Sequence, residues 1–191
     1  MKKIKIISSS VRTGRKSDRV VLYFKNYLEE NNIAAVEILD LKEYNFPVFE
    51  ERLKNLADPS PALLNYTSKI KEADGIILVT PEYNGGYPAS IKNAIDVLYA
   101  EWYHKPMAIA TVSDGSFGGS QVITSLQFSL WKIKAWVVPA MFPVPTVDKS
   151  FNEAGVPTDK DGTDKRAAAF INELMWAINL SSPAAQQGPV K

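Results

Sequence analysis

The stretch SSSVRTGRKS, residues 8–17, gathers hydroxyl and guanidinium groups in front of a segment with helical spacing. Backbone N–H groups at a helix N-terminus lack intrahelical acceptors, and the helix dipole favours a negative charge there. Serine hydroxyls and an arginine beside such an end suit a phosphate monoester. The alternative is a solvated turn in which Ser17 or Asp18 caps the helix. The stretch lacks the glycine spacing of a P-loop or a G-x-G-x-x-G motif, which argues against a nucleoside triphosphate site.

A second unusual stretch, PEYNGGYP, covers residues 81–88. Asn-Gly ordinarily signals a hairpin turn between two strands. Here Pro81 ends an apolar run and Pro88 begins a helical pattern, so we interpret the stretch as a loop and reject the hairpin. Its glycines allow close approach of the backbone, and Tyr83 offers an aromatic face. Such a loop could contact the edge of a flat heterocycle, although a rigid connection without a function remains the alternative.

The third stretch, SDGSFGGS at residues 113–120, contains three glycines within five residues and Phe117 between them. Close backbone approach to a ligand and ordinary loop flexibility explain these glycines equally well. Together, one anion pocket and two loops that can hold a planar ring suggest a phosphorylated aromatic cofactor. FMN, with one phosphate and one large flat ring, fits that description.

The segments between these loops alternate between strand and helix patterns. We expect strands at residues 4–8, 33–41, 75–80, 105–112 and 136–140, and helices at 17–31, 62–72, 88–100, 121–135 and 163–180. This alternation predicts an α/β, doubly wound fold with a five-stranded parallel sheet and helices on both faces, and a sheet of this kind often takes the order 2-1-3-4-5. In that topology the three loops follow strands 1, 3 and 4, so they meet at one edge of the sheet.

Composition limits the classes of function. The 191 residues suit one domain, which we place at 1–180, followed by a disordered tail at 181–191. A net charge of +1 gives no reason to expect nucleic acid or a membrane surface as a partner. The absence of cysteine and the single histidine, His104, exclude disulfides, thiolate catalysis and a His-rich metal site. No targeting segment is recognisable, so the cytoplasm is the expected compartment.

The sequence PEYNGGYPASIKNAIDVL resembles the NADPH-dependent FMN reductases of the flavodoxin-like fold, a group that includes chromate, azo and quinone reductases. The resemblance extends over residues 3–180. SSSVRTGRKS is similar to the family's phosphate loop, with Ser9 where that loop usually has glycine. EWYHKP, VSDGSFGG and FNEAGVPTD are similar to further family segments.

The resemblance implies a role for each loop. Ser10, Arg12 and Ser17 would hold the FMN phosphate, with Arg15 as a helper. The residues implied to line the isoalloxazine ring are Pro81, Glu82, Tyr83, Asn84 and Gly85, with Ser113 and Gly115 closing the far side. No side chain is implied to be catalytic, because FMN carries the chemistry. For the Glu82 side chain we favour a role in ordering its loop by hydrogen bonds over a role facing the ligand.

The implied reaction passes hydride from NADPH or NADH to the flavin, and then electrons to a small acceptor such as a quinone, an azo compound, a metal oxyanion or free flavin. Alternation of the two substrates predicts ping-pong kinetics. A homodimer or homotetramer is implied as well. The alternative is a flavodoxin-type electron carrier without NAD(P)H turnover, but flavodoxins are usually strongly acidic and this chain is balanced.

Aromatic residues around the only histidine are the last candidates. Tyr99, Trp102, Tyr103 and Phe117 could shape a substrate pocket or a subunit interface. His104 is interpreted as a loop residue before the fourth strand, with a role as a proton donor as the lesser alternative.

Overall fold

The computed structural model describes residues 1–181 and contains one five-stranded parallel sheet in the order β2-β1-β3-β4-β5. Its strands are β1 (Lys3–Ser8), β2 (Ala35–Asp40), β3 (Gly75–Pro81), β4 (Pro106–Val112) and β5 (Trp136–Val144). The predicted flavodoxin-like α/β fold is therefore confirmed, including the strand order.

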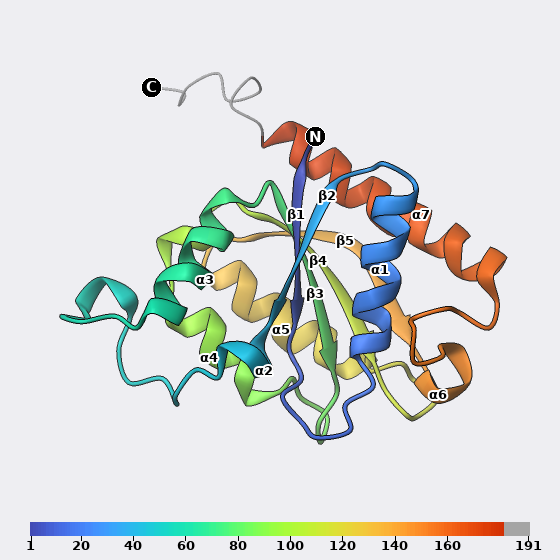
Figure 1. The fold of residues 1–191 in the computed structure, drawn as a ribbon, viewed down its shortest axis with the longest axis horizontal. Helices are drawn as coiled ribbons and strands as arrows, with labels where there is room; N and C mark the ends of the chain where they lie inside the picture. The colour runs from blue at the N-terminus through green and yellow to red at the C-terminus, as the bar shows by residue number, and fades with distance from the viewer. Residues whose placement is uncertain (182–191) are drawn as a thin grey trace.

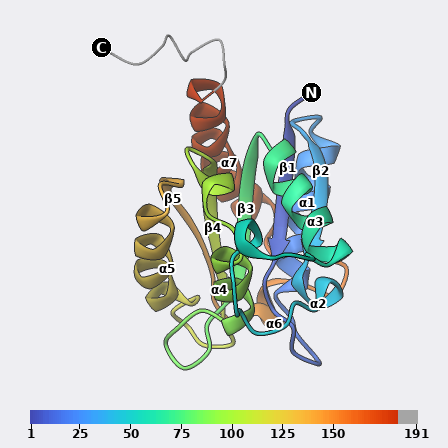
Figure 2. The same cartoon turned by 90° about the vertical axis from the view of Figure 1, so that its left-hand side faces the viewer.

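Helices cover both faces of the sheet (Figure 1). They are α1 (Asp18–Glu30), α2 (Leu41–Tyr44), α3 (Pro61–Glu72), α4 (Ala89–Asp96), α5 (Ser120–Lys132), α6 (Val147–Ser150) and α7 (Lys160–Leu180). Helices α1 and α7 pack on one face, and α3, α4 and α5 pack on the other. Figure 2 views the molecule from the side on which α3 and α4 lie.

The two hydrophobic cores arise from the alternation of side chains along each strand. On β1, Ile6 joins the core under α1 and α7, whereas Ile7 joins the core under α3, α4 and α5. Strands β3 and β4 occupy inner positions of the sheet and are covered on both faces, which explains why they read as continuous apolar runs.

Strand β5 is longer than predicted, because it continues through Pro143 to Val144 instead of ending at residue 140. Prolines usually argue against a strand, but β5 lies at the edge of the sheet, where one side of the strand needs no ladder hydrogen bonds. Its pairing with β4 is irregular between Met107 and Ile109. Of the predicted disordered tail, residues 182–191 lie outside the described residues.

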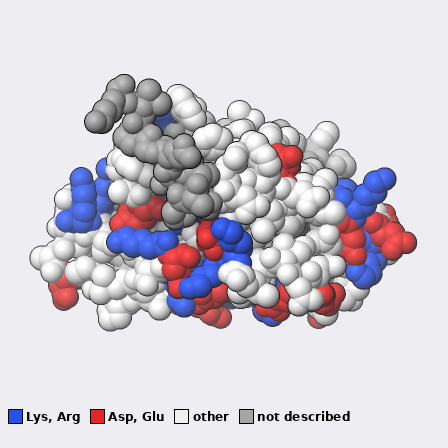
Figure 3. Space-filling view, turned by 90° about the horizontal axis from the view of Figure 1, so that it is seen from above, with Lys and Arg blue, Asp and Glu red and all other residues white. Residues whose placement is uncertain are grey.

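The three polar loops meet at the carboxyl ends of β1, β3 and β4, at the lower edge in Figure 1, with the N-terminus at the opposite edge. Viewed from above, basic and acidic residues are interspersed on the visible face, with no broad field of one sign (Figure 3). Among residues 1–181, no helix combines the length and hydropathy needed to cross a membrane.

Candidate functional site

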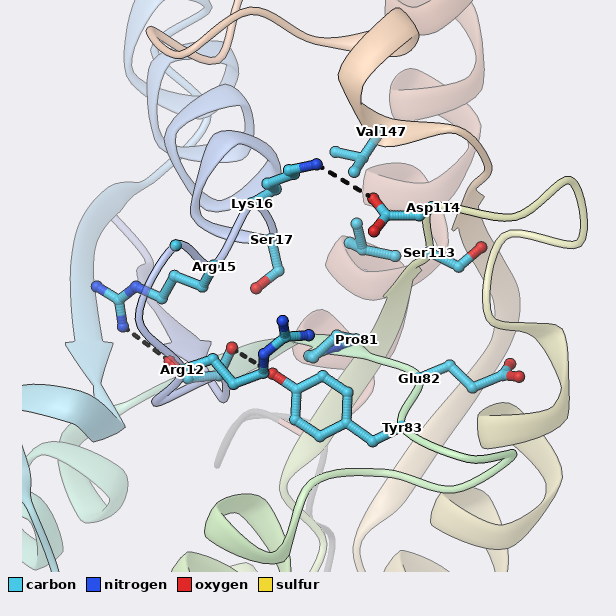
Figure 4. Close-up of a pocket in the computed structure, with 13 residues that line it drawn as sticks. Arg12, Arg15, Lys16, Ser17, Pro81, Glu82, Tyr83, Ser113, Asp114 and Val147 are labelled. Atoms are coloured by element: carbon cyan, nitrogen blue, oxygen red, sulfur yellow. Dashed lines mark hydrogen bonds and ion pairs between the residues drawn. The ribbon is translucent and has the colours of Figure 1, made fainter.

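A pocket lies where the three loops meet (Figure 4). It is lined by Ser10, Arg12, Gly14, Arg15, Lys16, Ser17, Pro81, Glu82, Tyr83, Val112, Ser113, Asp114 and Val147. The tertiary structure thus brings together eight of the eleven predicted site residues. The other three, Asn84, Gly85 and Gly115, lie in the same loops but do not line this pocket.

The first loop presents unsatisfied hydrogen-bonding groups at the N-terminus of α1. Within residues 1–181, no hydrogen bond engages the backbone N–H groups of residues 10–17. Ser17 occupies the N-cap position with helical backbone angles, φ −65° and ψ −20°, but its hydroxyl makes no capping bond. Of the two capping candidates, only Asp18 accepts a hydrogen bond with its side chain, from the N–H of Arg19 (3.0 Å). The Ser17 hydroxyl is buried without a partner and lines the pocket. Buried polar groups are normally paired, so this end of α1 is suited to an anion.

The two arginines of the first loop behave differently. Arg12 forms no ion pair within the described residues, and its guanidinium lies 5.5 Å from the centre of the Tyr83 ring. Arg15 turns away from the pocket (Figure 4) and pairs with Asp40 at the end of β2. Hydrogen bonding to that carboxylate raises the pKa of Arg15. Arg12 is therefore the guanidinium without a carboxylate partner, and the helper role implied for Arg15, which is paired with Asp40, stays a prediction.

The tip of the second loop is a hairpin turn after all. The N–H of Tyr83 donates to the carbonyl of Gly86 (2.8 Å), and the N–H of Gly86 donates back to Tyr83 (3.0 Å). Asn84 and Gly85 between them both have positive φ, 53° and 77°, as a type I′ turn requires. Our rejection of a hairpin was wrong because two residues can close this turn without long flanking strands.

The loop does leave a strand and enter a helix as predicted, since β3 ends at Pro81 and α4 follows Pro88. Tyr83 also connects this loop to the first loop. The hydroxyl groups of Tyr83 and Ser10 are 2.6 Å apart and share a hydrogen bond. This bond holds the two loops at a fixed spacing on one side of the pocket.

Glu82 does not have the role that we favoured for it. Its backbone N–H donates to the Val112 carbonyl (3.2 Å), but its carboxylate makes no hydrogen bond or ion pair within residues 1–181. Figure 4 shows the side chain directed away from Arg12 and Tyr83. The loop is ordered by its backbone bonds, and Glu82 is one of the residues that line the pocket.

The third loop is fixed by a hydrogen bond within it and by close packing against β4 and β5. The hydroxyl of Ser113 donates to the Gly115 carbonyl (2.9 Å). Gly118 and Gly119 have positive φ, and a Cβ at Gly118 would lie 2.9 Å from the Cβ of Pro143. These two glycines serve close packing of the loop against the sheet, which the sequence pattern alone could not distinguish from ligand approach.

Lys16 and Asp114 line the pocket and were missed by the sequence analysis. The Lys16 ammonium group pairs with Asp148 of α6 and lies 3.6 Å from Asp114 of the third loop. These pairs link the first loop, the third loop and α6 around the pocket. No local pattern signals them, because the positions of Lys16 and Asp148 differ by 132 in the sequence.

His104 and Trp102 lie elsewhere. His104 has a φ of 54°, its N–H donates to the Lys134 carbonyl (2.8 Å), and it lines a separate cavity with Trp136 and Leu180. Its interpretation as a loop residue before β4 is confirmed. Trp102 is fully buried and donates from Nε1 to the Ile95 carbonyl (3.0 Å), so it belongs to the core and neither to a pocket nor to an interface. In the described part of the chain, no cluster of His, Cys, Asp and Glu could hold a metal ion.

Comparisons with known proteins identify relatives of this chain. A sequence model of the family described as NADPH-dependent FMN reductase matches residues 2–149. The NAD(P)H-dependent FMN reductase LOT6 of Saccharomyces cerevisiae is 34% identical over 161 residues, which are 76% of this chain and 83% of that protein. The NADPH azoreductase of Bacillus sp. strain OY1-2 is 29% identical over 140 residues, 72% of this chain and 73% of the relative.

A shorter match and a solved structure add to these. A quinone reductase of Pseudomonas putida is 38% identical over 92 residues, 46% of each chain. The structure of FerB, a flavoenzyme NAD(P)H:(acceptor) oxidoreductase from Paracoccus denitrificans, superposes with a TM-score of 0.73 over 94% of this chain and 98% of its own. Its sequence identity is 22%, so this likeness concerns the fold.

Proposed function

Because the chain belongs to the NADPH-dependent FMN reductase family, we propose that it binds FMN at this sheet edge and reduces a small electron acceptor at the expense of NAD(P)H. The family assignment agrees with the resemblance found in the second loop. It also favours a reductase over the flavodoxin-type electron carrier considered as the alternative.

The observation that carries the proposal is the set of unsatisfied groups at the start of α1. The buried Ser17 hydroxyl and the unpaired Arg12 belong to residues that line one pocket, and the backbone N–H groups of residues 10–17 around them make no hydrogen bond within residues 1–181. These groups can donate hydrogen bonds to the oxygens of a phosphate monoester, which is the anionic end of FMN. The residues present therefore fit the cofactor of the family.

We assign the phosphate to Ser10, Arg12 and Ser17, and the ring to the second and third loops. Pro81, Glu82 and Tyr83 would line it from one side and Ser113 from the other. In the second loop the N–H groups of Glu82 and Tyr83 donate to the carbonyls of Val112 and Gly86. The backbone N–H groups that remain free to bind the ring are therefore those of Asn84 and Gly85. Gly115 lies next to Ser113, whose hydroxyl donates to its carbonyl, and its own N–H is also free.

When bound, FMN supplies the redox chemistry, taking a hydride from NAD(P)H and giving electrons to the acceptor. The protein's contribution is to bind, orient and stabilise. Backbone N–H groups aimed at the ring would stabilise negative charge on it, and they need no rearrangement during the reaction. No acid–base side chain is required, which agrees with the position of His104 outside the pocket.

For the acceptor, we propose quinones and azo compounds, following the names of similar enzymes. The test mixes the purified chain with FMN and either NADPH or NADH, and follows nucleotide oxidation with a quinone, an azo dye, a metal oxyanion and free flavin. Initial rates are measured at several concentrations of both substrates, and parallel lines in the double-reciprocal plot would support ping-pong alternation. A chain that binds FMN but consumes neither nucleotide would be an electron carrier, and the reductase proposal would fail.

We further propose a homodimer or homotetramer. Along the outer side of α5 and the loop before it, Phe117, Phe128 and Trp131 are exposed by 81, 61 and 65%. The rings of Phe128 and Trp131 lie 5.9 Å apart, and exposed aromatic clusters of this kind are typical of interfaces. Light scattering should report at least a dimer, and Phe128→Glu should dissociate it; a monomeric wild-type chain would contradict this proposal.

The cytoplasm remains the proposed compartment, because the reaction would draw on the NAD(P)H held there. Cell fractionation with an antibody against the chain tests this proposal. Recovery of the chain outside the cytoplasmic fraction would contradict it.

A further inference from the structure

Arg15 connects the first loop to the end of a neighbouring strand. Its Nη1 donates to the Ser10 carbonyl (2.8 Å) and to Oδ1 of Asp40 (2.6 Å), and its Nη2 donates to Oδ2 of the same carboxylate. The two side chains are mostly buried, with exposed fractions of 17% for Arg15 and 12% for Asp40. A two-pronged contact of this kind fixes the orientation of both groups as well as their separation.

Asp40 is itself rigidly held. It is the last residue of β2, and it pairs in register with Ser8 on β1, two residues before Ser10. Its Oδ1 also accepts a hydrogen bond from the N–H of Lys42 (3.0 Å) at the start of α2. The carboxylate is therefore held at the edge of the sheet, and Arg15, which binds both Asp40 and the Ser10 carbonyl, connects the first loop to it.

The contact with the Ser10 carbonyl matters for the loop's donors. In a trans peptide the C=O and the following N–H point in opposite directions, so fixing the Ser10 carbonyl also fixes the N–H of Val11. The Ser10 side chain is held separately by Tyr83. Both hydrogens of Arg15 Nη1 are donated to acceptors in the protein, the Ser10 carbonyl and the Asp40 carboxylate. Nη1 therefore has no hydrogen left to donate to a ligand.

We propose that Asp40 is a positioning residue for phosphate binding: through Arg15 it holds the first loop in the conformation that receives the phosphate. The inference rests on the proposed function, and it assigns Arg15 to the support of the loop, with Arg12 as the arginine that touches the anion. Asp40 is not one of the residues that line the pocket, and its hydrogen bonds to a lining residue are those with Arg15.

The test compares FMN with riboflavin, which has the same ring but no phosphate. Asp40→Asn keeps the size of the side chain but removes the charge and one acceptor. We expect its dissociation constant for FMN to rise about tenfold, at the low end of the effect of removing an outer partner of a ligand-binding group. The dissociation constant for riboflavin should change less than about twofold, because riboflavin makes no phosphate contacts.

Two more variants separate the roles of charge and geometry. Arg15→Lys keeps the positive charge but cannot form the two-pronged contact, so it should show the same phosphate-selective loss as Asp40→Asn. The double variant should lose little more than either single one, since both remove the same link. Glu43→Gln, an exposed carboxylate on α2, is the matched control and should leave both dissociation constants unchanged.

Several outcomes would overturn the inference. Equal losses for FMN and riboflavin would mean that Asp40 only supports the fold, and tighter FMN binding by Asp40→Asn would mean that the released Arg15 binds phosphate directly. An Arg15→Lys variant with wild-type FMN affinity would overturn it too, and this variant decides the matter if Asp40→Asn fails to fold. A wild-type chain that binds neither flavin would overturn the proposed function and this inference together, whereas the other outcomes leave the function standing.

Discussion

Replacing Ser17 by alanine should stabilise the free protein and weaken its affinity for FMN. The Ser17 hydroxyl is buried with no hydrogen-bond partner, and the residue is 3% exposed. An unsatisfied buried hydroxyl costs about 1–3 kcal/mol. A serine at the start of a helix usually stabilises the helix by a capping hydrogen bond from a backbone N–H to its hydroxyl oxygen. Ser17 makes no such bond, so its replacement by alanine removes no capping interaction.

The expected magnitudes follow from these two facts. Without flavin, Ser17→Ala should raise the free energy of unfolding by about 1 kcal/mol, at the low end of the cost of an unsatisfied hydroxyl. For a chain of this length, that corresponds to a rise in Tm of about 2–4 °C. With FMN, the lost hydrogen bond to a charged phosphate is worth about 1.5 kcal/mol or more, so the dissociation constant should rise at least about tenfold.

The assay is thermal unfolding with and without FMN, combined with titration of FMN and riboflavin. Ser60→Ala is the matched control, because Ser60 caps α3 by accepting a hydrogen bond from the N–H of Leu63 (3.2 Å). That variant should lose about 1 kcal/mol of stability and keep its affinity for FMN. The reasoning is refuted if Ser17→Ala destabilises the free protein as Ser60→Ala does, or if it binds FMN as tightly as the wild type.

Three further predictions concern stability. Tyr66→Phe should raise the free energy of unfolding by up to about 1 kcal/mol, since the Tyr66 hydroxyl is also buried without a partner; a clear loss in a urea titration would contradict this. Gly155→Ala should destabilise by about 2 kcal/mol or more, because φ is +78° and the new Cβ would lie 2.7 Å from the Arg19 carbonyl oxygen; unchanged thermal unfolding would count against it. For Glu37, burial alone would raise the pKa, but hydrogen bonds from Lys5 and Lys69 outweigh burial and lower it. A lowered folded-state pKa means that this contribution to stability is present above the unfolded pKa and is lost as the pH falls through the folded one. Glu37→Gln should therefore flatten the dependence of unfolding on pH below about 4.5, and an unaltered profile would refute the assignment.

The extent to which sequence predicts such a site is clearest in the first loop. Its position before a helix and its residue types indicate anion binding, because both follow from local spacing. Which arginine remains without a carboxylate partner depends on Asp40, which lies 25 positions from Arg15 and contacts it because β2 pairs with β1. A pattern within the loop cannot report that pairing.

Glu82 and the Asn84–Gly85 turn show the same limit in the second loop. The Asn-Gly pair favours a type I′ turn from its own backbone preferences, and the structure contains that turn; our error was to require long strands around it. For Glu82, the carbonyl of Val112 on β4 already receives the backbone N–H, so the carboxylate is not needed to order the loop.

The sequence by itself determined the order of the five strands and the five long helices, the family and the three loops of the candidate site, because periodicity, motifs and turn residues act over short distances along the chain. The short helices α2 and α6 were not predicted. The tertiary structure decided which groups in those loops remain free. Arg15 is engaged by Asp40, Lys16 by Asp148, and the Ser17 hydroxyl by nothing. Partners in a folded chain depend on strand register and helix packing, and the free groups left over are the ones that can bind a ligand.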